Sequence, residues 1–408
     1  MPRTVSLAID AIAAGGDGVG RSDGLVVFVP RTAPGDVITA AVAGKGHFAR
    51  GSLRTLQSES PLRVSPPCPH YTRERCGGCQ IQHIGYESQL AAKQRIIADA
   101  IRRIGRREVE LPPIVSSPHE WRYRTKLTLA LRRRGAHWIG GLHPFDDAAR
   151  VFALADCPVT DRRVVMAWRE IMDASQFFPD APALRGSVRW TAEGATLVMM
   201  GAVRWPSHEA FFAAVPSVVA LYWEPKDQAR RLLGERRTAP TPAASFAQVN
   251  PEMGQLLGEY VLGSVVQLSP KRVIDAYSGA GDLSVALSER GIAATAIELD
   301  ADAARWAEQR LEPPSRSIRG RVEDELPRAG FADVVVLNPP RGGLHEDVPA
   351  TLANVSRTPT IIYVSCDPAT LARDIARLPG YRIESVRAFD MFPQTAHVET
   401  VCILALEQ

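Results

Sequence analysis

Cys366 is the residue of this sequence whose position most favours covalent chemistry. It follows the hydrophobic run TIIYVS and precedes Asp367 and Pro368, so it stands where a strand ends rather than within one. A lone thiol is most often a small buried hydrophobe, but a thiolate with suitable neighbours is a strong nucleophile. Cys402 offers the contrast, because it lies inside VETVCILAL, a run typical of a core strand.

The segment FDMFPQTAHVET (389–400) brings two further reactive side chains before the last hydrophobic run. A carboxylate at Glu399 could act as a general base, and His397 lies two residues before it. Taken alone, this segment also fits an ordinary polar loop.

A glycine turn with an acidic residue downstream indicates a nucleotide-like ligand. DAYSGAGD places Gly279 and Gly281 between a hydrophobic run and the segment LSVALSER, and Glu298 ends the next run. Glycines let the backbone approach a ligand at a helix N-terminus, and such an acid can accept hydrogen bonds from ribose hydroxyls. The full dinucleotide pattern is missing, which favours S-adenosylmethionine over NAD. Asn338, in Asn-Pro-Pro-Arg, ends a further run and could donate or accept at the same edge.

Three of the six cysteines fall within twelve residues, as Cys68-x7-Cys76-x2-Cys79, and Cys157 is a distant fourth. Four thiolates suit tetrahedral zinc or a [4Fe–4S] cluster. The long loop before Cys157 and the absence of a histidine pair with finger spacing favour the iron–sulfur cluster.

The elements that must position these residues follow an α/β rhythm in residues 241–408. A strand that runs into a glycine turn at 273–282 and strand-like segments at 293–300, 332–340, 360–368 and 398–406 alternate with helical segments. This alternation predicts a parallel sheet covered by helices on both faces. The stretch RRTAPTPAA (236–244) is a natural linker before this domain.

The N-terminal part predicts two other units. Residues 1–57 combine short strand-like runs at 26–30 and 37–42 with glycine-rich turns, as in a small barrel. Residues 58–240 hold the cysteines, a helix at 86–105, a strand at 121–135 and a mixed α and β remainder. We therefore expect three domains: 1–57, 58–240 and 241–408.

Composition limits the class of protein. The chain has 408 residues, 45% hydrophobic and 23% charged, with a net charge of +3, and no run is long enough to cross a membrane. No export signal is evident, so we expect a cytoplasmic protein. Residues 102–134 carry ten Lys or Arg and three Glu. This basic block fits either a polyanion partner or a solvated face.

Taken together, C-x7-C-G-G-C-Q, D-x-Y-x-G-x-G, N-P-P-R, Y-V-S-C-D-P-A-T-L-A-R-D and F-P-x-T-x-H-V-E resemble the RNA 5-methyluridine methyltransferases over nearly the whole chain. The resemblance implies a doubly wound, Rossmann-like methyltransferase domain behind an OB-like TRAM barrel that binds RNA and a mixed α+β central domain. It also implies S-adenosylmethionine as methyl donor and ribosomal or transfer RNA as substrate. We expect a monomer without an obligate protein partner.

The resemblance also assigns roles to individual residues. Cys366 would add to C6 of the target uracil, and Glu399 would remove the C5 proton after methyl transfer. The four cysteines would hold a [4Fe–4S] cluster. The residues expected to contact the cofactor are Gln248, Tyr277, Asp282, Glu298 and Asn338.

Three positions depart from the family pattern. Asn338 stands where Asp is usual, Asp282 stands where Asn is usual, and Cys366 is followed by Asp367 rather than Asn. Asn-Pro-Pro also occurs in methyltransferases that modify exocyclic amines, but an aromatic residue normally follows it there, and here Arg341 follows. Two alternatives remain open: an RNA-binding or folding factor with a degenerate catalytic domain, and an RNA cytosine-C5 methyltransferase.

Overall fold

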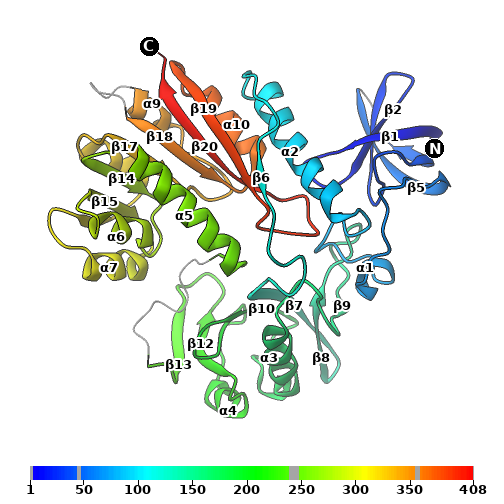
Figure 1. Ribbon diagram of the computed structural model, residues 1–408. Helices are drawn as coiled ribbons and strands as arrows, with labels where there is room; N and C mark the ends of the chain where they lie inside the picture. The colour runs from blue at the N-terminus through cyan, green and yellow to red at the C-terminus, as the bar shows by residue number, and fades with distance from the viewer. Residues whose placement is uncertain (1–2, 44–46, 239–247, 354–358, 408) are drawn as a thin grey trace.

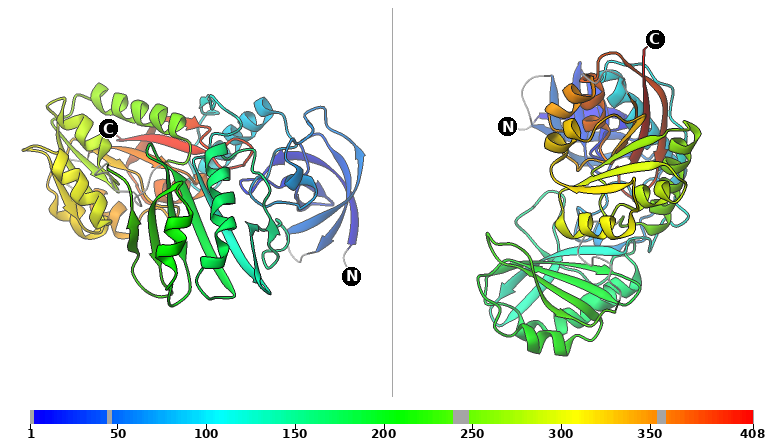
Figure 2. Two further views of the ribbon diagram at one scale, coloured as in Figure 1. Left: turned by 90° about the horizontal axis from the view of Figure 1, so that it is seen from below. Right: turned by 90° about the vertical axis from the view of Figure 1, so that its left-hand side faces the viewer.

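The computed structural model describes residues 3–43, 47–238, 248–353 and 359–407. The chain forms a small barrel, a central sheet with helices on one side, and a larger sheet with helices on both sides (Figure 1). These three bodies lie around a shared middle, with the N-terminal barrel at one end (Figure 2). The predicted α/β class, with its barrel and its Rossmann-like domain, is confirmed.

The N-terminal barrel closes in the order β1-β2-β3-β5-β4. Alternate residues of β1 are buried, so Val5, Leu7 and Ile9 point into the barrel core, as the two-residue period of a strand requires. The strands are β1 (Arg3–Ile12), β2 (Gly18–Ser22), β3 (Leu25–Val29), β4 (Val37–Ala43) and β5 (Phe48–Ser58).

Two helices connect the barrel to the rest of the chain: α1 (Pro69–Thr72) and α2 (Tyr86–Arg103). The predicted helix at 86–105 corresponds to α2. Although α2 lies far from the C-terminal domain in sequence, Ile97 and Ile101 pack against Ala388 and Val398.

The central sheet has the strand order β13-β12-β11-β10-β7-β8-β9. Leu127, Leu129 and Leu131 of β7 point to the face that α3 and α4 cover. The helices pack closely, because a Cβ added at Gly186 would lie 2.5 Å from the Trp168 ring. The elements are β7 (Lys126–Arg134), β8 (His137–Leu142), β9 (Phe152–Ala153), α3 (Arg162–Asp173), η1 (Ser175–Phe177), β10 (Ala183–Trp190), β11 (Ala195–Met200), α4 (His208–Ala214), β12 (Val218–Glu224) and β13 (Arg231–Glu235).

The strand predicted at 121–135 begins later than expected, because β7 starts at Lys126. Residues 122–124 instead run beside the segment after Cys157, where the amide of Arg122 donates to the carbonyl of Pro158 over 2.9 Å. Arg122 has φ of 58°, in the left-handed region that a regular strand does not use.

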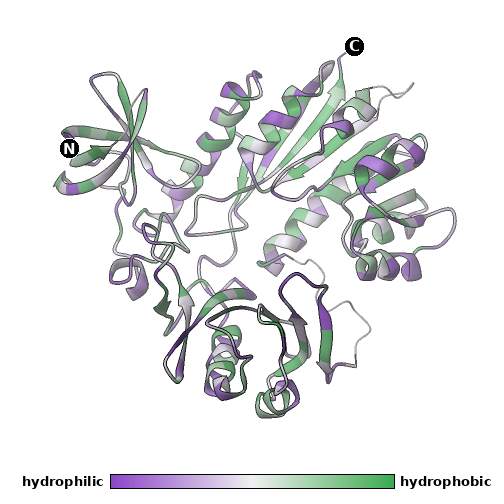
Figure 3. Ribbon diagram, turned by 180° about the vertical axis from the view of Figure 1, so that it is seen from behind, coloured by the Kyte–Doolittle hydropathy of each residue, from purple (hydrophilic) through white to green (hydrophobic). Residues whose placement is uncertain are grey.

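The C-terminal sheet has the order β16-β15-β14-β17-β18-β20-β19-β6. Its strands are largely hydrophobic (Figure 3). The five neighbouring strands β16, β15, β14, β17 and β18 are parallel, as predicted. The strand β20, in contrast, runs antiparallel to both of its neighbours, β18 and β19. The strands are β6 (Ile114–Val115), β14 (Arg272–Ala276), β15 (Ala293–Glu298), β16 (Arg316–Arg319), β17 (Val334–Leu337), β18 (Thr360–Ser365), β19 (Tyr381–Phe389) and β20 (Glu399–Leu406).

Helices cover both faces of this sheet, and each face has its own hydrophobic core. The helical elements are α5 (Pro251–Gln267), α6 (Asp282–Ser288), α7 (Ala301–Arg310), α8 (Val322–Glu325), η2 (Leu326–Arg328), α9 (Asp347–Ala353) and α10 (Pro368–Ala376). The edge strand β6 precedes the central sheet in sequence but pairs with β19. The predicted linker at 236–244 lies mostly outside the described residues.

Candidate active site

The strand register brings Cys366 and Glu399 together. Ser365 at the end of β18 pairs with Thr400 of the antiparallel strand β20. The next residue of each strand toward this edge is Cys366 on one side and Glu399 on the other. Thus an antiparallel strand, which the alternation of strands and helices did not predict, places the thiol beside the carboxyl group.

Glu399 is a buried carboxyl group, with 5% of its surface exposed. Burial raises its pKa to about 7, while the positive charge of Arg341 opposes the rise. Burial also raises the pKa of the Cys366 thiol, as does the negative charge of Glu399, and Arg341 again acts in the opposite direction. A carboxylate that titrates near neutral pH is suited to accept and release a proton.

A tight turn fixes Cys366 between β18 and α10. The Asp367 side chain caps α10 by accepting from the amide of Thr370 over 2.9 Å. The Ser365 hydroxyl accepts from the amide of Asp367 over 3.1 Å. Asp367 therefore has a structural role as the helix cap, which an Asn side chain at this position would also fill.

A buried polar network holds the loop between β19 and β20. Lys93 of α2 and Asp390 are both fully buried and form an ion pair, and Lys93 also donates to the carbonyl of Phe392 over 3.0 Å. The Tyr86 hydroxyl donates to Asp390 over 2.7 Å. The side chain of Gln89 bonds both the amide and the side chain of Gln394. Sequence reasoning missed this network, because nothing in the helical pattern of α2 marks Lys93 as buried.

His397 is exposed, and its ring packs edge-on against Phe392 with 6.0 Å between centroids. Burial of the ring nitrogens and the nearby charge of Arg341 lower the pKa of His397. His397 and Arg341 line the same cavity as the four cysteines. The side chain of His397 therefore borders the cysteine region, two residues before Glu399 in the chain.

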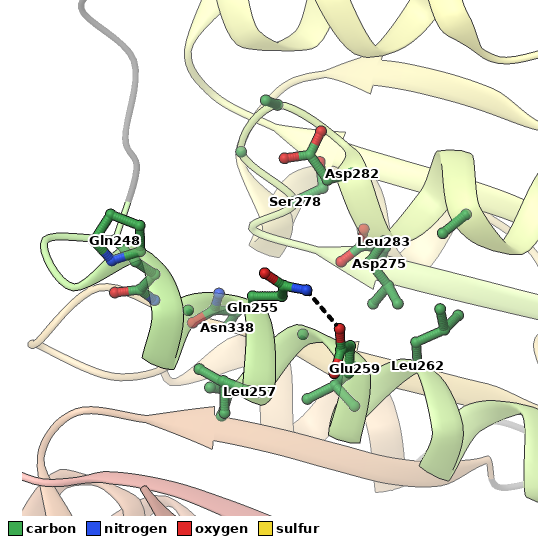
Figure 4. A pocket seen from close by; sticks show the side chains of 18 of the residues that line it. Gln248, Gln255, Leu257, Glu259, Leu262, Asp275, Ser278, Asp282, Leu283 and Asn338 are labelled. Carbon is green, nitrogen blue, oxygen red and sulfur yellow. Dashed lines mark hydrogen bonds between the residues drawn. The ribbon is translucent and has the colours of Figure 1, made fainter. Parts of the chain in front are cut away.

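A cavity of about 810 Å³ opens beside the glycine turn, at the carboxyl ends of β14 and β17. Four of the five residues predicted to contact the cofactor line it: Gln248, Tyr277, Asp282 and Asn338. Figure 4 shows Gln248, Asp282 and Asn338 around this cavity. Open α/β sheets bind their ligands at this edge.

The glycine turn adopts left-handed backbone at three positions. Tyr277, Gly279 and Gly281 have φ of 61°, 57° and 77°. A Cβ at Gly281 would also lie 2.5 Å from Cβ of Ala307, so only glycine lets α6 approach α7 this closely. Burial raises the pKa of the Tyr277 hydroxyl to about 12, so it stays protonated at neutral pH.

Glu298 does not line the cavity. Its two carboxylate oxygens accept from the amides of Gly279 and Asp300, each over 2.8 Å. In this arrangement Glu298 holds the glycine turn in place. Each carboxylate oxygen has a further lone pair, which could accept a hydrogen bond from a ligand. Asp282 pairs with Arg310 over 2.9 Å, so this acidic residue is held by a neighbouring helix.

Asp275 also lines the cavity and was missed by sequence reasoning. Its carboxyl group is buried, accepts from the Ser284 hydroxyl over 2.8 Å, and has a pKa raised to about 6 by burial. Its position near the end of β14 was the available signal. Gln255 and Glu259 of α5, which bond each other over 2.8 Å, line the opposite wall (Figure 4).

The four predicted ligand cysteines line one cavity of about 360 Å³. Burial raises the pKa of Cys76 to about 11 and that of Cys79 to about 12, and the neighbouring thiols raise both further. Among the residues with described positions, no group of three or more His, Cys, Asp or Glu side chains is arranged to hold a metal ion. The sulfur atoms are therefore gathered around one space without forming the shell of a single ion.

Cys402 is fully buried in the core of the C-terminal sheet, as expected. No helix within the described part of the chain is long and apolar enough to cross a membrane.

Comparison with known proteins identifies the family of the chain. The model of the tRNA (Uracil-5-)-methyltransferase family matches residues 321–407, a range that includes Cys366 and Glu399. An uncharacterized RNA methyltransferase of Halalkalibacterium halodurans is 30% identical over 99% of this chain and 97% of its own length. One from Gloeobacter violaceus is 32% identical over 100% and 97%.

The fold also matches a solved structure. The Pyrococcus abyssi tRNA (uracil-54, C5)-methyltransferase, in complex with S-adenosyl-L-homocysteine, superposes with a TM-score of 0.72 at 24% identity, over 98% of this chain and 99% of that one. These relatives span the whole chain, so the chain belongs to the family of S-adenosylmethionine-dependent RNA methyltransferases that includes the tRNA (uracil-5-)-methyltransferases.

Proposed function

We propose that the protein methylates C5 of a uridine in ribosomal or transfer RNA through a covalent adduct with Cys366. The observation that carries the proposal is the pairing of β18 with β20, which sets Cys366 beside the buried Glu399. A nucleophile and a base side by side are what this substitution requires.

The chemistry follows from the weakness of uracil C5 as a nucleophile. The Cys366 thiolate forms a bond to C6, and the electrons of the C5–C6 double bond move into an enolate. C5 then takes the methyl group from the sulfonium, which leaves S-adenosylhomocysteine. Glu399 removes the C5 proton, the double bond re-forms, and the Cys366 thiolate is expelled. A pKa of about 7 for Glu399 lets it accept this proton and return it to solvent.

The cofactor would occupy the cavity beside the glycine turn. Gln248, Tyr277 and Asn338 line the space, and Glu298 supports the turn that forms one wall. Relative to the family pattern, the acid and the amide have changed places, with Asp at position 282 and Asn at position 338. The uncharged side chain of Asn338 at the end of β17 can both donate and accept hydrogen bonds to a ligand.

The test compares wild type with Cys366→Ala on RNA from cells that lack the enzyme, with labelled S-adenosylmethionine. We expect wild type to form 5-methyluridine and the variant to form none. Nucleoside mass spectrometry separates this product from 5-methylcytidine. Detection of 5-methylcytidine instead would show that the target base is cytosine and not uracil. Normal methylation by Cys366→Ala would rule out the covalent mechanism. RNA binding with neither methyl transfer nor cofactor binding would indicate an RNA-binding or folding factor.

We also propose that Cys68, Cys76, Cys79 and Cys157 bind a [4Fe–4S] cluster. They line one cavity, yet they are not arranged for a single ion. Four thiolates are the usual ligand set of such a cluster. The sequence favours the cluster over zinc, because the loop before Cys157 is long and no histidine pair has finger spacing. A cluster there would tie the loop before α2 to the loop after β9. Anaerobic purification should give a brown protein with iron and acid-labile sulfide, and a colourless zinc protein would contradict the proposal.

A further inference from the structure

The central sheet has one face that α3 and α4 leave uncovered, and its side chains are cationic. Leucines of β7 point toward the helices, so Lys126 and Thr128 point to the other side. On β10, Arg185, Ser187 and Arg189 alternate in the same way. In Figures 1 and 2 the helices lie on the side of this sheet away from the C-terminal domain, so the uncovered face looks toward that domain.

A cavity of about 230 Å³ lies on this face, several times the volume of roughly 30 Å³ that a water molecule occupies. Four of its lining residues are cationic and three carry hydroxyl groups, while none is acidic or aromatic. The lining residues are Lys126, Thr128, Arg185, Ser187, Arg189, Thr196, Val198, Met200 and Arg230. Arg230 pairs with Glu224 over 3.2 Å, so an acid borders the cluster on one side.

The cluster places like charges together. The pKa of Lys126 falls to about 8, first because the amine is partly buried and then because Arg189, Arg230, Arg124 and Arg185 surround it. An anion among these groups would relieve their mutual repulsion.

Thr196 gives an independent sign of a ligand. Its side chain is 2% exposed, and its hydroxyl oxygen has no hydrogen-bond partner within the described part of the chain. A buried hydroxyl without a partner is costly. The neighbouring hydroxyl groups of Thr128 and Ser187 bond each other over 3.0 Å, so the hydroxyl of Thr196 is the one left over on this wall.

The cavity also adjoins the cofactor cavity and the cavity of the four cysteines. Arg189 lines it together with the cofactor cavity. Thr128 and Arg185 line it together with the cavity that contains Arg341 and His397. A group bound here would therefore border the cavity that contains Arg341, whose positive charge acts on both Cys366 and Glu399.

We propose that this cavity, formed by Lys126, Arg185, Arg189 and Thr196, binds a backbone phosphate of the RNA next to the target nucleotide. The inference rests on the proposed function, whose site it extends. Guanidinium, ammonium and hydroxyl groups are the usual partners of RNA phosphates. The absence of aromatic lining residues argues against a base, which would need a surface to stack on. Phosphate contacts beside the target hold the backbone while the base leaves its stack.

The test measures binding of fluorescein-labelled oligouridylate at several salt concentrations. The slope of log affinity against log salt is negative, and each lost phosphate contact should lower its magnitude by about 0.7 for single-stranded RNA. We expect this decrease for Lys126→Ala and for Arg185→Ala, with unchanged affinity for S-adenosylmethionine. The matched control is Arg162→Ala, an exposed arginine on α3, on the opposite side of the sheet. Slopes equal to wild type in both test variants, or an equal decrease in the control, would overturn the proposal.

The variant Thr196→Val tests the proposed phosphate site without removing a charge, because it replaces only the hydroxyl group. Since the hydroxyl has no partner in the free protein, the variant should have an equal or higher melting temperature and yet bind the oligonucleotide more weakly. If this variant bound the oligonucleotide with wild-type affinity, the hydroxyl group of Thr196 would not contact the phosphate. These binding measurements need no turnover, so they stand even if wild type forms no 5-methyluridine, which would refute the proposed reaction instead.

Discussion

Replacing Glu399 by Gln should stabilise the protein at alkaline pH while it stops turnover. The carboxyl group is buried, and its pKa rises from 4.5 to about 7 on folding. That difference corresponds to about 3 kcal/mol against the charged form in the folded protein. The neutral amide of Gln avoids this cost and fits nearly the same space.

The sign of the pH dependence follows from linkage. Below the unfolded pKa, Glu399 is protonated in both states and costs nothing. As the pH rises from about 4.5 to about 7, the unfolded state ionises first, so the folded state loses stability relative to the variant. Glu399→Gln should therefore melt like wild type near pH 4 and several degrees higher at pH 8, since a domain of 150–250 residues gains about 2–4 °C per kcal/mol.

The assay is differential scanning calorimetry across this pH range, with the exposed Glu346→Gln as the matched control. In parallel, Glu399→Gln should accumulate a covalent complex with RNA in the presence of S-adenosylmethionine, because the C5 proton stays in place. A melting difference that does not change between pH 4 and pH 8 would refute the assigned burial cost. Rapid turnover by the variant would refute the role as base.

Three other predictions concern residues around the site. Arg341→Met should move the rising limb of the pH–rate profile upward by about one pH unit, since Arg341 lowers the pKa of both Glu399 and Cys366; an unchanged limb would contradict this. Lys93→Met should destabilise the protein by about 3–5 kcal/mol in chemical denaturation, because Asp390 stays buried without its ion-pair partner, and adding Asp390→Asn should recover part of the loss. Gly281→Ala should weaken cofactor binding in calorimetry more than Gly279→Ala, because both positions have positive φ but only Gly281 has a close neighbour; equal effects would exclude the steric cause.

The order of strands and helices could be predicted because hydrophobic periodicity is local. The hydrophobic runs before Gly279 and before Cys366 are strands of the predicted sheet, and the helix at 86–105 is α2. The antiparallel direction of β20 could not be predicted in this way, because it depends on which neighbour the strand pairs with rather than on its own pattern.

The site was predictable where a motif carried it, and less so where a role depends on distant contacts. Glu298 ends its strand as expected, but its carboxylate bonds the backbone of the glycine turn. The buried Lys93 and Asp390 are about three hundred positions apart in the chain, and no local pattern links them. The hydroxyl of Thr196 similarly shows its lack of a partner only in the folded sheet.

The pairing of β6 with β19 has a consequence for how the chain is made in the cell. The residues from Tyr86 to Val115 leave the ribosome long before their partners in the C-terminal sheet, which lie about three hundred positions later in the chain. Until then the ammonium group of Lys93 and the apolar side chains of Ile97 and Ile101 on α2 face solvent or a chaperone. The central sheet can fold during this delay, because its strands pair among themselves, as domains generally fold in units during synthesis. Thus we expect the reaction centre to be completed only after β19 and β20 have been synthesised, and a nascent chain that stalls before β19 to hold a folded central sheet without a reaction centre.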